Sequence, residues 1–385
     1  MIRRGEPAFW RTNLALFAAG LATFALLYAV QPLLPVFAQV FGRGAAGASL
    51  VLSLTTACLA VCLLAASAVA DALGRKPVMV AAMLSSALLC MACGAAPTYP
   101  TLLLLRALMG VTLSGLPAVA MAYTAEEMAP SAASLAIGLY IGGSAIGGMT
   151  GRLLAAALAD ALGWRTALAA IGVLGMLCAL ALFLFLPASR HFIRQSPRPA
   201  RIAAAMAGQA RLGLQRRLFA LGFLLMGAFV TTYNYVGFRL LAPPYTLRQA
   251  TVGLIFSVYL VGVVSSTLMG GAGRNFGRGR VIGANLALMA AGLGLTLASP
   301  LWLIVAGVAA ITAGFFGAHA VASAWVAEAG GATRAQASAM YLFCYYAGSS
   351  VVGSLGGLAW SHAAWPGTAA LIFLCITSGL VIAPR

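Results

Sequence analysis

Long apolar stretches separated by short polar turns fill almost the whole chain of 385 residues. An α-helix needs about 20 apolar residues to cross the hydrocarbon core of a bilayer. Cutting the chain at its charges and turn signals predicts twelve such helices, and the turn residues Pro97–Pro100, Pro300 and Pro366 divide the longest runs. The predicted spans are 12–39, 47–71, 77–96, 100–124, 131–158, 165–186, 217–241, 249–272, 281–298, 301–326, 335–360 and 365–384. The pattern therefore predicts an all-α membrane protein.

The composition excludes a water-soluble globule, because 62% of the residues are hydrophobic and only 8% are charged. The first span follows Arg3 and Arg4, as in a signal peptide, but its apolar region exceeds the 7–15 residues typical of one. We expect a retained helix that is continuous through Pro32 and Pro35, since a helix inside a bundle tolerates proline.

The charges are strongly unequal, with 23 Lys and Arg against 6 Asp and Glu. With twelve crossings, most arginines fall in loops on one side, above all Arg190, Arg194 and Arg198 in the central segment. Because positive charge marks the cytoplasmic face, we expect a multi-pass protein with both termini in the cytoplasm. Topology explains the basic excess, so we expect lipid bilayer contacts and no nucleic acid partner.

Four short segments have weakly similar counterparts about 201–208 residues later in the chain, each at a similar place in a half of six helices. The pairs are 71–76 with 274–279, 35–37 with 243–245, Trp164 with Trp365, and 143–148 with 348–353. The repeat predicts an N-terminal six-helix bundle (1–186), a cytoplasmic linker (187–216) and a C-terminal six-helix bundle (217–385). Secondary transporters use this arrangement of two halves.

Three motifs carry a family resemblance. The segment Asp71-Ala-Leu-Gly74-Arg75-Lys76 resembles the G-x-L-A-D-R-x-G-R-K loop of the major facilitator superfamily, with Ser67 for its first glycine and Ala72 for its first arginine. Arg106-Ala-Leu-Met-Gly110 resembles the family's R-x-x-x-G element, and 138–148 its glycine-rich antiporter motif, with Ser144 for proline. The resemblance is closest to small bacterial drug or sugar efflux permeases. It implies twelve helices in two pseudo-symmetric halves, a place in the bacterial inner (plasma) membrane, and export of a small organic solute by alternating access.

The first motif predicts a gating cluster of charges. Asp71 favours an adjacent helix N-terminus, which the resemblance identifies as that of the helix starting near Ala335. A tight turn at Gly74 lets Arg75 reach one of two carboxylates at the inner end of the fourth helix. The predicted gating residues are Asp71, Gly74, Arg75, Glu126 and Glu127. The matching position in the second half is Arg274, and a cation near a helix N-terminus is unfavourable. We therefore expect no symmetric second ion-pair cluster and a charged latch mainly in the first half, with ordinary headgroup-level charges as the alternative.

Glycines on the fifth predicted helix recur at the spacing that lets membrane helices pack closely. The predicted helix-packing residues are Gly138, Gly142, Gly143, Gly147 and Gly148. Static packing and a moving hinge are both compatible with this stripe.

Apart from Asp71 at the cytoplasmic edge of the span 47–71, no Asp or Glu lies inside any predicted span, whereas Arg106, Arg152, Arg239 and His319 do. Intramembrane charge is costly and usually functional, although Arg152 and Arg239 can snorkel to the interface and His319 can be a packed hydrogen-bonding group. The absence of an embedded carboxylate disfavours cation–proton exchange and favours a neutral or anionic solute. The predicted substrate-binding residues are Tyr28, Gln31, Arg106, Asn234, Tyr235, Tyr259, His319 and Tyr345.

No enzymatic motif is present: the chain has no Walker loop, zinc-type histidine cluster or G-x-S-x-G element. Cys90 and Cys93 have redox spacing but lie in an apolar span, which favours packing. We therefore expect a monomeric transporter with no cofactor, metal or catalytic residue, and with protons as the candidate coupling ion. The alternatives are uptake or facilitated exchange of a neutral or anionic organic solute, and a non-transporting membrane receptor or scaffold on the same fold.

Overall fold

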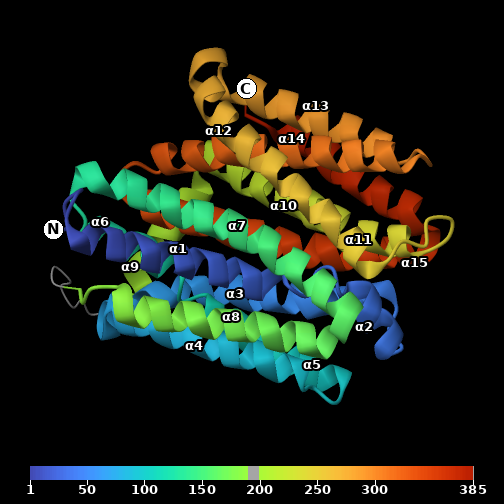
Figure 1. Cartoon of the computed structure of the whole chain (residues 1–385). Helices are drawn as coiled ribbons and strands as arrows, with labels where there is room; N and C mark the ends of the chain where they lie inside the picture. The colour runs from blue at the N-terminus through green and yellow to red at the C-terminus, as the bar shows by residue number, and fades with distance from the viewer. Residues whose placement is uncertain (190–198, 385) are drawn as a thin grey trace. The chain divides into compact units, whose positions relative to one another are not determined.

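The computed structural model describes residues 1–189 and 199–384, where all regular structure is helical apart from one isolated bridge between Ile2 and Met128. The all-α prediction is therefore confirmed (Figure 1). Arg190, Arg194 and Arg198, to which the charge pattern assigns a topological role, lie outside the described residues.

Ten of the described segments are long and apolar enough to cross a membrane. One of them, 331–382, covers the two predicted spans 335–360 and 365–384. Its backbone is not helical at Ala363 and Ala364, which lie between these two spans. The predicted span 281–298 corresponds to α13 (Arg278–Leu295), which is not among the ten. Each predicted span thus has a helical counterpart, and the count of twelve is supported approximately.

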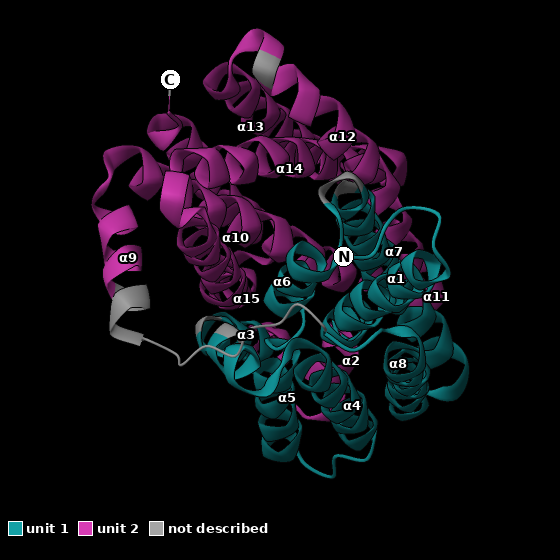
Figure 2. Ribbon diagram, turned by 90° about the vertical axis from the view of Figure 1, so that its left-hand side faces the viewer, with its two compact units in different colours: residues 1–33, 54–198 teal, residues 34–53, 199–385 magenta. Residues whose placement is uncertain are grey.

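The chain divides into two compact units, 1–33 with 54–198 and 34–53 with 199–385 (Figure 2). The first unit holds α1 (Pro7–Tyr28), the second part of α3 (Ala45–Leu73), α4 (Arg75–Gly94), α5 (Tyr99–Leu113), α6 (Pro117–Glu127), α7 (Pro130–Leu162) and α8 (Trp164–Phe185). Within it, α1 packs against α7 and α8, and α4 packs against α8 and α5.

The second unit holds α2 (Leu34–Val40), the start of α3, α9 (Pro199–Arg211), α10 (Gly213–Leu241), α11 (Gln249–Gly253), α12 (Tyr259–Phe276), α13, α14 (Leu301–Ala329) and α15 (Arg334–Ile382). The 3₁₀ turns η1 (Leu254–Val258) and η2 (Gly331–Thr333) precede α12 and α15. Within this unit, α10 packs against α15, and α14 packs against α12 and α13. The repeat-based boundaries 1–186, 187–216 and 217–385 stay a prediction.

The expectation of a continuous first helix is wrong. α1 ends at Tyr28, and α2 begins at Leu34 after an irregular segment, 29–33. Pro32 has no backbone N–H and disfavours helical geometry at the residue before it, while Pro35 suits the first turn of a new helix. The predicted span 100–124 is likewise divided, since α5 ends at Leu113 and Pro117 starts α6.

Glycines allow the closest helix contacts in both units. A Cβ added at Gly143 or Gly147 of α7 would overlap the backbone carbonyl oxygens of Phe17 and Leu21 in α1. In the second unit, a Cβ at Gly348 of α15 would overlap the carbonyl oxygen of Phe223 in α10. Corresponding helices of the two units therefore pack through corresponding glycines.

The predicted glycine surface is wider than the one observed. A Cβ at Gly138 or Gly142 meets no described atom within 4 Å, and one at Gly148 lies 3.2 Å from Nη1 of Arg152 on the same helix. Gly151, which the sequence pairs with Gly147 at four-residue spacing, is also in the contact, because a Cβ there would lie 2.5 Å from Cα of Ala25 in α1. The close approach of α1 and α7 is thus made by Gly143, Gly147 and Gly151 on α7 and by Gly20 on α1, where a Cβ would lie 2.4 Å from the carbonyl oxygen of Tyr140.

Candidate functional site

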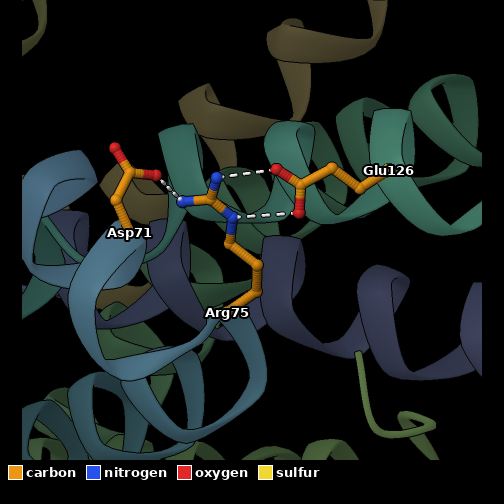
Figure 3. Close-up of polar contacts among 3 residues, drawn as sticks. All are labelled: Asp71, Arg75 and Glu126. Atoms are coloured by element: carbon orange, nitrogen blue, oxygen red, sulfur yellow. Dashed lines mark hydrogen bonds and ion pairs between the residues drawn. The ribbon is translucent and has the colours of Figure 1, made fainter. Parts of the chain in front are cut away.

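One guanidinium joins the ends of three helices in the first unit (Figure 3). Gly74 takes φ 101°, a conformation that glycine adopts readily, and so lets Arg75 begin α4 directly after α3. Nη1 of Arg75 lies 2.6 Å from Oδ1 of Asp71 on α3. Its Nη2 and Nε donate to the two carboxylate oxygens of Glu126 on α6, at 2.7 and 3.2 Å. Of the two carboxylates that the sequence left open, Arg75 thus pairs with Glu126; Glu127 is buried beside it.

A corresponding ion pair is present in the second unit, contrary to expectation. Gly277 takes φ 87°, Arg278 begins α13, and its Nη2 pairs with Oε2 of Glu328 at the end of α14. The prediction relied on the arginine at position 274 and overlooked the pair formed by these two side chains. The second pair is more exposed, with side-chain exposures of 26% and 69% against 9% and 29% for Arg75 and Glu126.

Arg106 lies in the middle of α5 and is fully buried. Its Nη1 donates to the carbonyl oxygen of Leu26 at 3.3 Å, and its Nη2 to that of Leu27 at 2.8 Å. The last four carbonyl groups of a helix lack intrahelical partners, and a cation there interacts favourably with the helix dipole. Arg106 therefore holds the end of α1, immediately before the break.

Arg152 of α7 contacts the same break through neutral groups. Its Nε donates to Oε1 of Gln31 at 2.6 Å, and its Nη1 to the carbonyl oxygen of Gly148 at 2.5 Å. The guanidinium lies 4.1 Å from the ring centroid of Tyr28, within the range of a cation–π interaction. Only 1% of Arg152 is exposed, so it is buried rather than snorkelling to the interface. The structure thus brings the predicted residues Tyr28 and Gln31 together around an arginine that the predicted binding group omitted.

The predicted residues of the second unit form two groups. Tyr235 of α10 donates its hydroxyl to the carbonyl oxygen of Gly353 at 2.6 Å, and its neighbour Asn234 is buried. His319 of α14 forms a 2.9 Å hydrogen bond through Nδ1 with the hydroxyl of Tyr341, and its ring centroid lies 4.8 Å from that of Tyr345. The aromatic cluster around these rings also includes Tyr259, Phe229, Tyr233, Phe256, Phe315, Phe316 and Tyr346.

The sequence places Tyr341 among the aromatic residues on helices expected to line the cavity, but the predicted substrate-binding group includes only its neighbour Tyr345, since an aromatic residue in a membrane helix is usually a packing residue. Its spacing of four residues from Tyr345 was the available signal, since such residues share a helix face. The described residues contain no group of three or more His, Cys, Asp or Glu side chains able to hold a metal ion.

The acidic residues lie at the ends of helices. Glu6 is the N-cap of α1, and each other acid lies within two residues of a helix C-terminus: Asp71, Glu126, Glu127, Asp160 and Glu328. Arg106 and Arg152, in contrast, lie well within α5 and α7. The described membrane segments of the first unit are therefore positively charged in their middle parts.

Comparison with known proteins places this fold in a family. The sequence profile of the Major Facilitator Superfamily matches residues 14–249. The inner membrane transport protein YnfM of Escherichia coli is 46% identical over all of this chain and 92% of its own length. The MFS-type transporter YybF of Bacillus subtilis is 42% identical over 96% of this chain and 92% of its own length.

Solved structures share the fold at low sequence identity. A point mutant of the nucleoside transporter NupG superposes with a TM-score of 0.80 at 14% identity, covering 97% of this chain and 100% of that one. The human organic anion transporter MFSD10 superposes with a TM-score of 0.71 at 18% identity, covering 98% and 99%. The chain therefore belongs to the major facilitator superfamily and is a multi-span membrane transporter of that family.

Proposed function

We propose that this protein exports a small organic anion across the bacterial inner membrane by alternating access, as a monomer with both termini in the cytoplasm. The observation that carries the proposal is the separation of charge: Arg106 and Arg152 are buried within α5 and α7, while every acidic residue lies at a helix end. Buried positive charge attracts an anion and repels a cation, and the low local dielectric strengthens both effects.

One relative supports the choice of an anion. A gallate transporter of Pseudomonas putida is 33% identical over 174 residues, which is 45% of this chain and 39% of that protein. Gallate is an aromatic carboxylate, and we propose a solute of this chemical class. The resemblance of 138–148 to the antiporter motif supports export rather than uptake.

Coupling to protons requires a group within the membrane that can gain and lose a proton. Histidine has this property, and His319 is the histidine within α14, hydrogen-bonded to Tyr341 and stacked in the aromatic cluster. We therefore assign proton coupling to His319. The Arg75 cluster (Asp71, Arg75 and Glu126) has the proposed role of holding the cytoplasmic side closed by fixing the ends of α3, α4 and α6.

The test is a counterflow experiment with the purified chain in proteoliposomes. Four compounds are compared: the carboxylates benzoate and gallate, the cation tetraphenylphosphonium and the neutral benzamide. For each one, liposomes loaded with the unlabelled compound are diluted into a solution of its labelled form. The proposal predicts accumulation of the labelled carboxylates only. Accumulation of the cation with no carboxylate counterflow would overturn it.

A further inference from the structure

The first membrane helix is interrupted at a place where two arginines approach it from other helices. Residues 29–33 are irregular, and Ala29, Val30, Gln31 and Leu33 are buried. Non-helical backbone at membrane depth is tolerated where protein buries it or where it lines a binding site, and transporters place substrates at such breaks. This segment is therefore the part of the first unit where a ligand is expected to bind.

The two arginines at the break make different kinds of contact. Arg106 donates to the main-chain carbonyls of Leu26 and Leu27, which belong to the C-terminal end of α1. A helix C-terminus carries the equivalent of about half a negative charge, so Arg106 more than offsets it. Arg152 instead donates to a side chain, the amide oxygen of Gln31, and its charge adds to a region that is already positive.

The groups around Arg152 are suited to exchange for an anion. An amide oxygen is a weaker acceptor for a guanidinium than a carboxylate, which binds through two parallel hydrogen bonds. A carboxylate that replaces Oε1 of Gln31 at Nε of Arg152 gains this stronger interaction, and the Gln31 amide can then donate its N–H groups to the same carboxylate. Tyr28, with its ring 4.1 Å from the guanidinium, limits where the rest of the solute can lie.

We infer that Arg152 binds the carboxylate of the transported anion at the α1 break, with Gln31 as its exchangeable partner and Arg106 as a positioning residue. This inference rests on the proposed function, because it names the residues that select the anion. It also distinguishes two arginines that have the same charge and nearly the same burial.

The test measures binding of benzoate by the full chain in nanodiscs, with benzamide as the neutral probe of equal shape. Binding is read from ligand-dependent thermal stabilisation. Gln31→Glu places a fixed carboxylate on Arg152, so it should keep the protein folded and weaken benzoate binding at least about tenfold. Arg152→Gln should weaken it similarly, and Arg152→Lys should retain part of the affinity, since a lysine keeps the charge but loses the planar fork.

Arg165 provides the matched control. It lies in the same unit, near the start of α8, and donates to the carbonyls of Gly94 and Ala96. Arg165→Gln should leave benzoate binding unchanged. Wild-type affinity in both Gln31→Glu and Arg152→Gln would overturn the inference while leaving anion transport intact. Failure of the wild type to prefer benzoate over benzamide would overturn the proposed function, and the inference with it.

Discussion

Nε of Arg152 donates a 2.6 Å hydrogen bond to Oε1 of Gln31, joining α7 to the break that ends α1. The two residues are 121 positions apart in the chain, and each is 1% exposed. The Gln31 amide is neutral, so an anion that replaces its oxygen at Nε of Arg152 does not displace a carboxylate from that atom. A buried arginine beside an amide is suited to an anion, whereas a cation exchanger is expected to have a carboxylate embedded in the membrane.

Replacing Arg106 should reduce the stability of the first unit. Arg106→Met leaves the carbonyls of Leu26 and Leu27 without the hydrogen bonds that they receive from the guanidinium. A hydrogen bond to a charged group contributes about 1.5–3 kcal/mol, so we expect a clear fall in the unfolding temperature. Thermal unfolding followed by intrinsic fluorescence measures it, and an unchanged unfolding temperature would contradict the positioning role.

The two corresponding ion pairs should contribute unequally to the conformational equilibrium. Glu126→Gln removes a carboxylate that binds Arg75 through both oxygens in a half-buried setting, and Asp71→Asn removes the other partner. We expect each to shift the population about fivefold toward the inward-open state, which corresponds to about 1 kcal/mol. Site-directed labelling of single cysteines at the two ends of the helices measures the ratio of states.

Glu328→Gln is the matched variant for that experiment. Its carboxylate is 69% exposed, and exposed ion pairs contribute little, so the shift should stay below about twofold. A larger shift for Glu328→Gln than for Glu126→Gln would show that the second pair, not the Arg75 cluster, controls the equilibrium.

Two glycines of α7 should respond in opposite ways to alanine. In Gly147→Ala the new Cβ would overlap the backbone of Leu21, so α1 and α7 must move apart and the protein should be destabilised. Gly142→Ala meets no described atom within 4 Å and replaces a poor helix former, so it should be neutral or stabilising by up to about 1 kcal/mol. The unfolding temperatures of the two variants test this difference, and equal effects would show that the close contact does not govern stability.

His319→Gln should uncouple transport from the proton gradient. The variant loses the titrating group but retains a polar side chain beside Tyr341, so counterflow of benzoate should persist while its acceleration by a pH gradient disappears. His362, which is exposed, is the control, and His362→Gln should behave as the wild type. If gradient-driven flux survives in His319→Gln, the coupling site lies elsewhere.

The fold followed from the sequence because membrane spans need only length and apolar composition. The contact of Arg75 with an acid near residue 126 was also predictable, since a glycine turn fixes where the arginine begins its helix. The Arg278–Glu328 pair was not predicted, because the repeat aligns Arg274 with Asp71 and the second half therefore lacks the acid that begins the motif. The ion pair forms four residues later, between Arg278 and Glu328.

The Arg152 site could not be predicted, since it depends on two features that composition does not determine. Proline is compatible with both a continuous and a broken helix, so Pro32 did not reveal the break. The side chain reaches Gln31 only because Gly147 and Gly151 bring α7 against α1 in one register. Helix spacing alone left Arg152 near the outer interface, where snorkelling was an equally good explanation.

The most direct test of this account is the exchange of labelled benzoate by Gln31→Glu proteoliposomes beside wild-type proteoliposomes. The variant should reconstitute in equal amount with an unfolding temperature at least as high as the wild type, because the introduced carboxylate and Arg152 would form an ion pair. Its exchange rate should nevertheless fall at least about tenfold, a loss of about 1.4 kcal/mol or more. Exchange at the wild-type rate would contradict the claim that Arg152 at the α1 break selects the anion.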